Sequence, residues 1–368
     1  DVVERFEKAV GIRATYPEGV WNKRSPAVKR SYLFLTQFRE SQFEAALDLA
    51  RRGGFRQVLI LQDSWCTGTG HYDINRVSFP DGLDGLARTV RRFREAGIET
   101  GLHVLGASIY PPDRYITPVP DGRLLKGAQT ILAASLDPHT TSIPVTEMPE
   151  GFPREDGGYN GRGIVLQIGT ELIKYESLST DPPAFLQCRR GYLGTRPQSH
   201  AAGTPVRHLV RAYGYHMHDM DTTLLDEVTS NFAAVVNATD VNMVYFDGSE
   251  RLQGDHWRYN ARLIKAMTDR IRRTDMLYQA SSFSHYSWHL LARSASADGH
   301  GDLKGYLEQR APMFADFARN GMPLDIGWYY GYDRNATPDM YEYILGATIG
   351  YDSSMSYQVS IDAAARHP

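Results

Sequence analysis

Short apolar runs alternate with helical patterns over the first part of the chain. Runs at 31–35, 57–61 and 98–105 predict buried strands, because each is short, apolar and bounded by polar or glycine residues. Between them, 43–52 and 83–95 carry apolar residues at the spacing of one helix face. The order strand, helix, strand, helix, strand predicts right-handed βαβ units and a parallel sheet.

The pattern changes over residues 111–210, which are rich in Pro, Gly and Thr and contain no convincing long helix. Alternating runs at 141–145, 163–168 and 171–175 predict short strands, and Gly169-Thr170 predicts a hairpin turn between the last two. A structureless loop of this length is uncommon inside a compact domain. We therefore interpret 111–210 as a β-rich domain inserted after the third strand.

The α/β pattern resumes after the insertion and completes a barrel. The predicted strands are 241–246, 277–281, 290–297 (together with a helix end), 324–330 and 348–353, and the predicted helices are 222–237, 259–273 and 303–320. Eight strands with seven intervening helices predict a (β/α)8 TIM barrel formed by 1–110 and 211–368. A doubly wound open sheet is the alternative, but no Gly-x-Gly-x-x-Gly follows the first strand.

Composition and charge narrow the range of partners. The formal net charge of −3 gives no reason to expect nucleic acid or an anionic membrane, and no apolar run reaches the length of a membrane span. The 22 Tyr and 5 Trp against 14 Phe suit surfaces that stack on sugars, although a tyrosine-rich core would give the same bias. The two cysteines, Cys66 and Cys188, fit no metal-ligand spacing, so we expect free thiols, with one disulfide as the alternative.

Functional groups of TIM barrels lie at the carboxyl ends of the strands, which selects a few of the 43 acidic residues. Strand-end carboxylates can also cap helices, and aromatic residues can pack in the core. The residues expected to converge on this rim are Asp63 and Trp65 after the second strand, His103 on the third, Asp247 and Glu250 after the fourth, Asp298 and Asp302 after the sixth, Trp328 and Tyr330 after the seventh, and Asp352 at the eighth.

Three segments follow one another around the second and third strands: Gln62-Asp-Ser-Trp-Cys66, Phe79-Pro-Asp-Gly-Leu83 and Ala96-Gly-Ile-Glu-Thr-Gly-Leu-His103. In order and spacing they resemble two turns and a strand of the α-galactosidase-type clan of glycoside hydrolases, families 27 and 36. Met243-Val-Tyr-Phe-Asp247 is similar to the clan's fourth strand, which ends in the nucleophile. Arg293-Ser-Ala-Ser-Ala-Asp298 is similar to the sixth-strand segment that holds the acid/base.

The resemblance implies a retaining α-glycosidase that acts on an oligo- or polysaccharide and needs no cofactor. Asp247 would attack the anomeric carbon, and Asp298, or Asp302 in its place, would be the acid/base. Retention predicts carboxyl groups about 5–5.5 Å apart, whereas inversion predicts about 6.5–9.5 Å. The candidate substrate-binding residues are Asp63, Trp65, His103, Glu250, Arg293, Asp302, Trp328 and Tyr330.

Some features leave alternatives open. Gln62 stands where the clan has Asp, so galactose specificity does not follow, and a glycosidase for a uronic or modified sugar and a non-catalytic carbohydrate-binding barrel both remain. A metal-dependent hydrolase is a further alternative, built on the potential ligands at 216–221, which precede a helix where Asp caps are expected. The basic residues between Arg189 and His208 either contact an anionic polysaccharide or form a solvated face. We expect a secreted or periplasmic protein rather than a cytoplasmic one.

Overall fold

The computed structural model describes residues 1–296, 303–326 and 337–366 and divides into two compact units. The barrel unit comprises 1–67, 72–106 and 232–368, and the insert unit comprises 68–71 and 107–231. The insert unit is therefore larger than the predicted 111–210. Both flanks of the predicted range join this unit, where β4 (Ser108–Ile109) pairs with β13 (Tyr215–Met217). No helix within the described ranges is long and apolar enough to cross a membrane.

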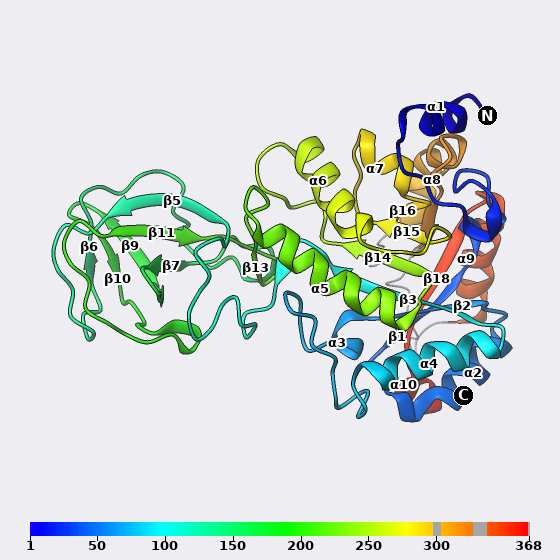
Figure 1. Cartoon of the computed structure of the whole chain (residues 1–368), viewed down its shortest axis with the longest axis horizontal. Helices are drawn as coiled ribbons and strands as arrows, with labels where there is room; N and C mark the ends of the chain where they lie inside the picture. The colour runs from blue at the N-terminus through cyan, green and yellow to red at the C-terminus, as the bar shows by residue number, and fades with distance from the viewer. Residues whose placement is uncertain (297–302, 327–336, 367–368) are drawn as a thin grey trace. The chain divides into compact units, whose positions relative to one another are not determined.

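The barrel unit is built on eight parallel strands closed in the order β1-β18-β17-β16-β15-β14-β3-β2, which confirms the predicted (β/α)8 barrel. The strands are β1 Tyr32–Thr36, β2 Gln57–Ile60, β3 Glu99–Leu105, β14 Met243–Asp247, β15 Leu277–Ala280, β16 Arg293–Ser296, β17 Leu324–Ile326 and β18 Ser354–Ser360. In Figure 1 the longer helices of this unit lie around the outside of the strands.

Sequence periodicity predicted five of the ten α-helices in the described residues, namely α2, α4, α5, α6 and α8. Two of them, α2 and α4, have the predicted bounds, and they pack together through Phe43 and Phe93, whose ring centroids lie 4.6 Å apart. The α-helices are α1 Val2–Val10, α2 Phe43–Arg52, α3 Gln62–Trp65, α4 Leu83–Glu95, α5 Leu224–Thr239, α6 His256–Asp269, α7 His285–Leu290, α8 Leu303–Arg319, α9 Pro338–Gly350 and α10 Ile361–Arg366.

The prediction of the eighth strand at 348–353 is wrong. The apolar residues there end helix α9, and the strand is β18, which begins at Ser354. The hydroxyl groups of Ser354 and Ser356 point into the barrel and donate hydrogen bonds to Asp325, so β18 lacks the apolar pattern of a buried strand. Asp352 consequently precedes the strand, at the amino end of the barrel, where it forms an ion pair with Lys29.

The insert unit is β-rich, as predicted. A four-stranded antiparallel sheet has the order β5-β11-β7-β8, and two three-stranded sheets have the orders β6-β10-β9 and β12-β13-β4. The predicted hairpin is formed by β7 and β8, with Ile168 opposite Glu171 and Gly169 at a φ of 58° in the turn. The remaining bounds are β5 Lys126–Ile131, β6 Ile143–Pro144, β7 Val165–Ile168, β8 Glu171–Lys174, β9 Ser177–Thr180, β10 Pro183–Leu186, β11 Pro205–Leu209 and β12 Arg211–Ala212.

A buried carboxylate organises one part of the insert unit. Glu171 is fully buried and accepts hydrogen bonds from Arg190 Nε and Nη2, each at 2.8 Å, and its Oε2 lies 2.8 Å from His200 Nε2. Burial raises the pKa of Glu171, but the hydrogen bonds from Arg190 and His200 outweigh burial and lower the pKa below its ordinary value. His208 is also buried and bonds to the Gly163 carbonyl, so these three basic residues form no outward-facing patch.

Replacing Glu171 with alanine should strongly destabilise the insert unit. The change leaves the Arg190 guanidinium buried without its carboxylate, which typically costs about 3–5 kcal/mol. The measurement is denaturant unfolding of the full chain. Glu176→Ala is the matched control, because Glu176 is exposed on the same hairpin region, and its effect should stay within about 0.5 kcal/mol. Equal unfolding free energies for the two variants would contradict the structural role of Glu171.

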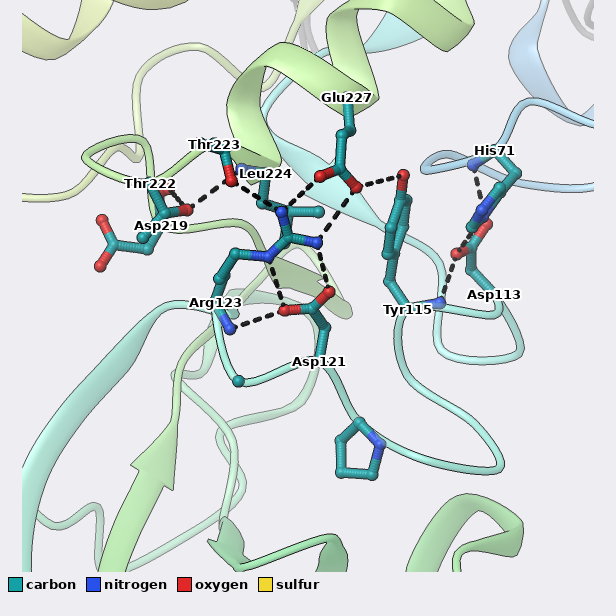
Figure 2. A network of polar contacts seen from close by, with 12 residues as sticks. His71, Asp113, Tyr115, Asp121, Arg123, Asp219, Thr222, Thr223, Leu224 and Glu227 are labelled. Atoms are coloured by element: carbon teal, nitrogen blue, oxygen red, sulfur yellow. Dashed lines mark hydrogen bonds and ion pairs between the residues drawn. The ribbon is translucent and has the colours of Figure 1, made fainter.

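A second polar network in the insert unit joins the segment before β5 to the first turn of α5 (Figure 2). Arg123 stands at its centre and donates to both carboxylate oxygens of Asp121, at 3.0 and 2.7 Å, and to the Thr223 hydroxyl at 2.8 Å. Arg123 also donates to Glu227, which in turn accepts from the Tyr115 hydroxyl at 3.4 Å. The hydrogen bonds from Arg123 lower the pKa of Asp121 and of Glu227.

The stabilisation from this network should depend on pH. The pKa values of Asp121 and Glu227 are lower in the folded protein than in the unfolded chain. The stabilisation is therefore fully present above the pKa values of the unfolded chain, and it is lost as the pH falls through the lowered pKa values of the folded protein. We expect Arg123→Met to cost about 1 kcal/mol near pH 7, since the network is partly exposed. The cost should shrink between about pH 5 and pH 3. Thermal unfolding of the wild type and of Arg123→Met across this pH range measures the cost. A cost that does not change with pH would contradict the role of the two carboxylates.

Candidate active site

Asp247 is the last residue of β14, at the carboxyl end of the barrel. The parallel pairing of β14 with β3 sets Asp247 beside Leu105 and Tyr245 beside His103. Alternate residues of a strand face the same side, so Tyr245 and Asp247 share one face. His103 Nε2 lies 3.3 Å from Asp247 Oδ2, and the Tyr245 hydroxyl lies 3.5 Å from Oδ1. With 19% of its side chain exposed, Asp247 is a carboxylate held at both oxygens and still accessible to solvent.

His103, predicted to bind substrate, is placed to orient Asp247. Its side chain is only 5% exposed and packs against the rings of Phe34 and Tyr245, with centroids 5.5 and 5.3 Å away. The backbone of His103 is fixed as well, because its carbonyl accepts a hydrogen bond of 2.9 Å from the Trp65 indole. His103 therefore contacts the carboxylate from within the barrel rather than from its surface.

The segment after β2 contributes one exposed carboxylate and two buried residues. Gln62 is buried, and its Oε1 accepts a 2.7 Å hydrogen bond from the Leu105 backbone N–H. Trp65 is fully buried and stacks on Tyr72 at 5.9 Å, so it presents no face to a sugar, and its predicted stacking role is corrected to a core position. Asp63, which was predicted to bind substrate, is exposed on α3, directly after β2 at the carboxyl end of the barrel.

A hollow of about 550 Å³ lies in the connection between β2 and α4, on the same side of the barrel as the carboxyl ends of the strands. Its lining combines charged, amide and apolar groups, which suits a polar ligand with apolar faces. The lining residues are Thr67, Asp73, Ile74, Asn75, Arg76, Val77, Gly82 and Leu83. Asn75 connects this hollow to the candidate site, because its side-chain amide donates to the Asp63 carbonyl at 3.0 Å.

Arg293 does not belong to the carboxyl rim, which corrects its predicted role in substrate binding. It is the first residue of β16, and parallel strands begin at the amino end of the barrel. Its side chain is fully buried, donates to the Arg30 carbonyl at 2.8 Å, and lies 5.3 Å from the Tyr32 ring centroid. Burial lowers the pKa of Arg293 and raises that of Asp325, which are neighbours in this interior layer.

Four predicted residues, Asp298, Asp302, Trp328 and Tyr330, lie outside the described residues, and their roles remain predictions. Glu250 is among the described residues and is exposed in the turn after Asp247. This turn is the position at the carboxyl rim where it was predicted.

Sequence reasoning missed Tyr245 and the serine residues around the end of β14. Tyr245 could have been found, because it precedes Asp247 by two positions and a strand repeats its facing every second residue. Ser249 bonds across to the next connection: its backbone N–H donates to Ser281 at 3.1 Å, and its carbonyl accepts from Ser282 at 2.7 Å. No local pattern predicts these contacts, because they join different βα connections.

The residues at 216–221 are not arranged as a metal site. Within 1–296, 303–326 and 337–366, no three or more His, Cys, Asp or Glu side chains are grouped so that they could hold a metal ion. His216 is buried in the insert unit, and burial lowers its pKa to about 3. Cys66 and Cys188 are both free thiols, as expected.

Comparisons with known proteins support the fold. No protein-family model and no curated protein sequence matches the chain. A GH36 α-galactosidase from Geobacillus stearothermophilus is 14% identical, with a TM-score of 0.50 over 92% of this chain and 39% of that chain. A trehalose-6-phosphate hydrolase from Bacillus licheniformis is 8% identical, with a TM-score of 0.52 over 90% and 65%.

A GH31 sulfoquinovosidase from E. rectale is 10% identical, with a TM-score of 0.52 over 98% of this chain and 46% of that chain. The chain therefore spans less than half the length of the GH36 and GH31 structures and about two thirds of the trehalose-6-phosphate hydrolase. At these identities the likeness shows a common TIM-barrel fold.

Replacing Gln62 with methionine should destabilise the barrel without removing a group that contacts substrate. The Leu105 N–H would be left buried without an acceptor, which typically costs about 1–3 kcal/mol. Denaturant unfolding of the full chain measures the loss, and Gln309→Met, on an exposed side chain of α8, is the control. A Gln62→Met protein as stable as the control would show that this hydrogen bond does not support the end of β3.

Proposed function

We propose that the chain is a retaining α-glycosidase acting on an oligo- or polysaccharide, with Asp247 as nucleophile and Asp298 as acid/base. Asp302 is the alternative acid/base, since both residues follow β16 in the sequence. The observation that carries the proposal is the geometry of Asp247. It is a partly exposed carboxylate at the carboxyl end of β14, and His103 and Tyr245 contact its two oxygens.

The proposed reaction has two balanced steps. In the first, an Asp247 oxygen forms a bond to the anomeric carbon while the glycosidic C–O bond breaks, and the leaving oxygen takes the proton of Asp298. In the second, a water oxygen attacks the anomeric carbon, the water proton passes to Asp298, and the ester to Asp247 breaks. His103 and Tyr245 would keep the carboxylate aimed at the anomeric carbon through both steps.

The solved structures of similar fold support the reaction class and leave the sugar open. They are an α-galactosidase, a trehalose-6-phosphate hydrolase and a sulfoquinovosidase, whose names refer to different sugars. The fold alone is compatible with many chemistries. The proposal of glycoside hydrolysis therefore depends on Asp247 together with the resemblance of its strand to the clan's nucleophile strand.

A specificity other than galactose is the second candidate, and Gln62 favours it. In the resembling clan the carboxylate at this position binds galactose hydroxyl groups, whereas here the Gln62 Oε1 is occupied by the Leu105 N–H. Asp63 would then be the remaining hydroxyl ligand of this pair, and a uronic or modified sugar remains a candidate substrate. A screen that includes such sugars beside α-galactosides distinguishes the two specificities.

Asp247→Asn should abolish turnover and leave the fold intact. The amide has nearly the same shape but is no nucleophile, so we expect kcat to fall at least about 1,000-fold. The measurement is hydrolysis of p-nitrophenyl α-glycosides, raffinose and stachyose, with circular dichroism to verify folding. Asp48→Asn, on the exposed face of α2, is the control and should keep full activity. Unchanged turnover in Asp247→Asn would remove Asp247 from the mechanism.

A further inference from the structure

Trp257 is a large apolar side chain that the fold leaves in solvent. It is 48% exposed, whereas Trp21 and Trp65 are 5% and 0% exposed. The imidazole of His285 stacks on the indole, with ring centroids 4.5 Å apart and an interplanar angle of 22°. The His256 ring also lies beside the indole, with centroids 5.8 Å apart and an interplanar angle of 74°, so two imidazole rings support a side chain that stays nearly half exposed. A flat, exposed indole supported from behind is the kind of surface on which the apolar face of a pyranose ring stacks.

The chain topology places this pair on the carboxyl side of the barrel. Trp257 lies in the first turn of α6, which follows β14 and Asp247, and His285 is the first residue of α7, which follows β15. In a βα unit the helix runs back along the strand, so its first turn lies near the strand's carboxyl end. The pair therefore stands on the same end of the barrel as Asp247, on the outer ring of helices.

Hydrogen bonds between the two connections hold the pair in place. His256, next to Trp257, bonds through Nε2 to the Phe283 carbonyl at 3.1 Å. The Asn260 amide donates to the Ser282 hydroxyl at 3.1 Å, and its carbonyl accepts from the Ser287 hydroxyl at 2.7 Å. These bonds attach the first turn of α6, which carries Trp257, to the segment after β15, which leads to His285.

We propose that Trp257, supported by His285, binds a second sugar ring of the substrate, one linked to the ring that reacts at Asp247. The inference rests on the proposed function and extends it: the substrate would be an oligosaccharide with at least two rings in contact with the protein. Trp257 increases the affinity for this second sugar ring and takes no part in the bond changes at the anomeric carbon.

The test compares substrates with and without a second ring in Trp257→Ala. For stachyose and maltotetraose, kcat/KM should fall about tenfold, which corresponds to about 1.4 kcal/mol. For α-galactosyl and α-glucosyl fluoride, whose leaving group cannot stack, kcat/KM should stay within about twofold of the wild type. Trp257→Phe should recover part of the loss because it keeps an aromatic face. Phe6→Ala, which removes an exposed aromatic ring from α1, should change neither substrate class.

A binding measurement separates this inference from the proposed function. Stachyose and maltotetraose are titrated into Asp247→Asn, which leaves them intact, and into Asp247→Asn/Trp257→Ala, with calorimetry as the readout. Weaker binding only in the double variant supports the subsite even where no glycoside is hydrolysed, in which case the proposed function alone fails. Equal binding by the two proteins, binding by neither, or an equal loss of activity on the glycosyl fluorides would overturn the subsite.

Discussion

The parallel pairing of β3 with β14 is the constraint on which the candidate site depends. This register puts His103 beside Tyr245 and Leu105 beside Asp247, so the carboxylate meets its imidazole neighbour at the end of the barrel. Two side chains of α3 hold the backbone of β3 at this end. The Trp65 indole bonds to the His103 carbonyl, and Gln62 accepts from the Leu105 N–H. A shift of one residue along either strand would turn His103 or Asp247 to the opposite face.

Two interior carboxylates show how depth within the barrel separates a structural role from the proposed catalytic one. Asp325 is fully buried near the amino end, where Tyr32, Ser354 and Ser356 donate to it and burial raises its pKa. Among the described residues His103 and Tyr245 contact Asp247, which retains exposed surface at the carboxyl end. A group that must reach a substrate needs that exposed surface, whereas a group surrounded by donors stabilises the barrel interior.

Local patterns predicted the barrel and placed Asp63, Asp247 and Glu250 at its carboxyl end, and long-range contacts account for what they missed. The periodicity of 43–52 and 83–95 gave two helices with correct bounds, because one apolar face is enough to specify an amphipathic helix. The last strand escaped detection because Ser354 and Ser356 turn polar groups toward Asp325, a partner distant in sequence. The same limitation applies to the candidate site: the sequence shows only that Gln62 stands where the clan has Asp, and the contact with Leu105, which is distant in sequence, determines its role.

The central claim is that Asp247 forms a covalent bond with the sugar, and covalent trapping tests it most directly. The chain would be incubated with 5-fluoro-α-glycosyl fluorides of the sugars it hydrolyses, digested, and analysed by mass spectrometry. The account predicts one added fluoroglycosyl group on the peptide that contains Asp247, with the bond at that carboxylate. A label on a different carboxylate, or rapid turnover of the sugar with inversion at the anomeric carbon and no covalent adduct, would contradict it.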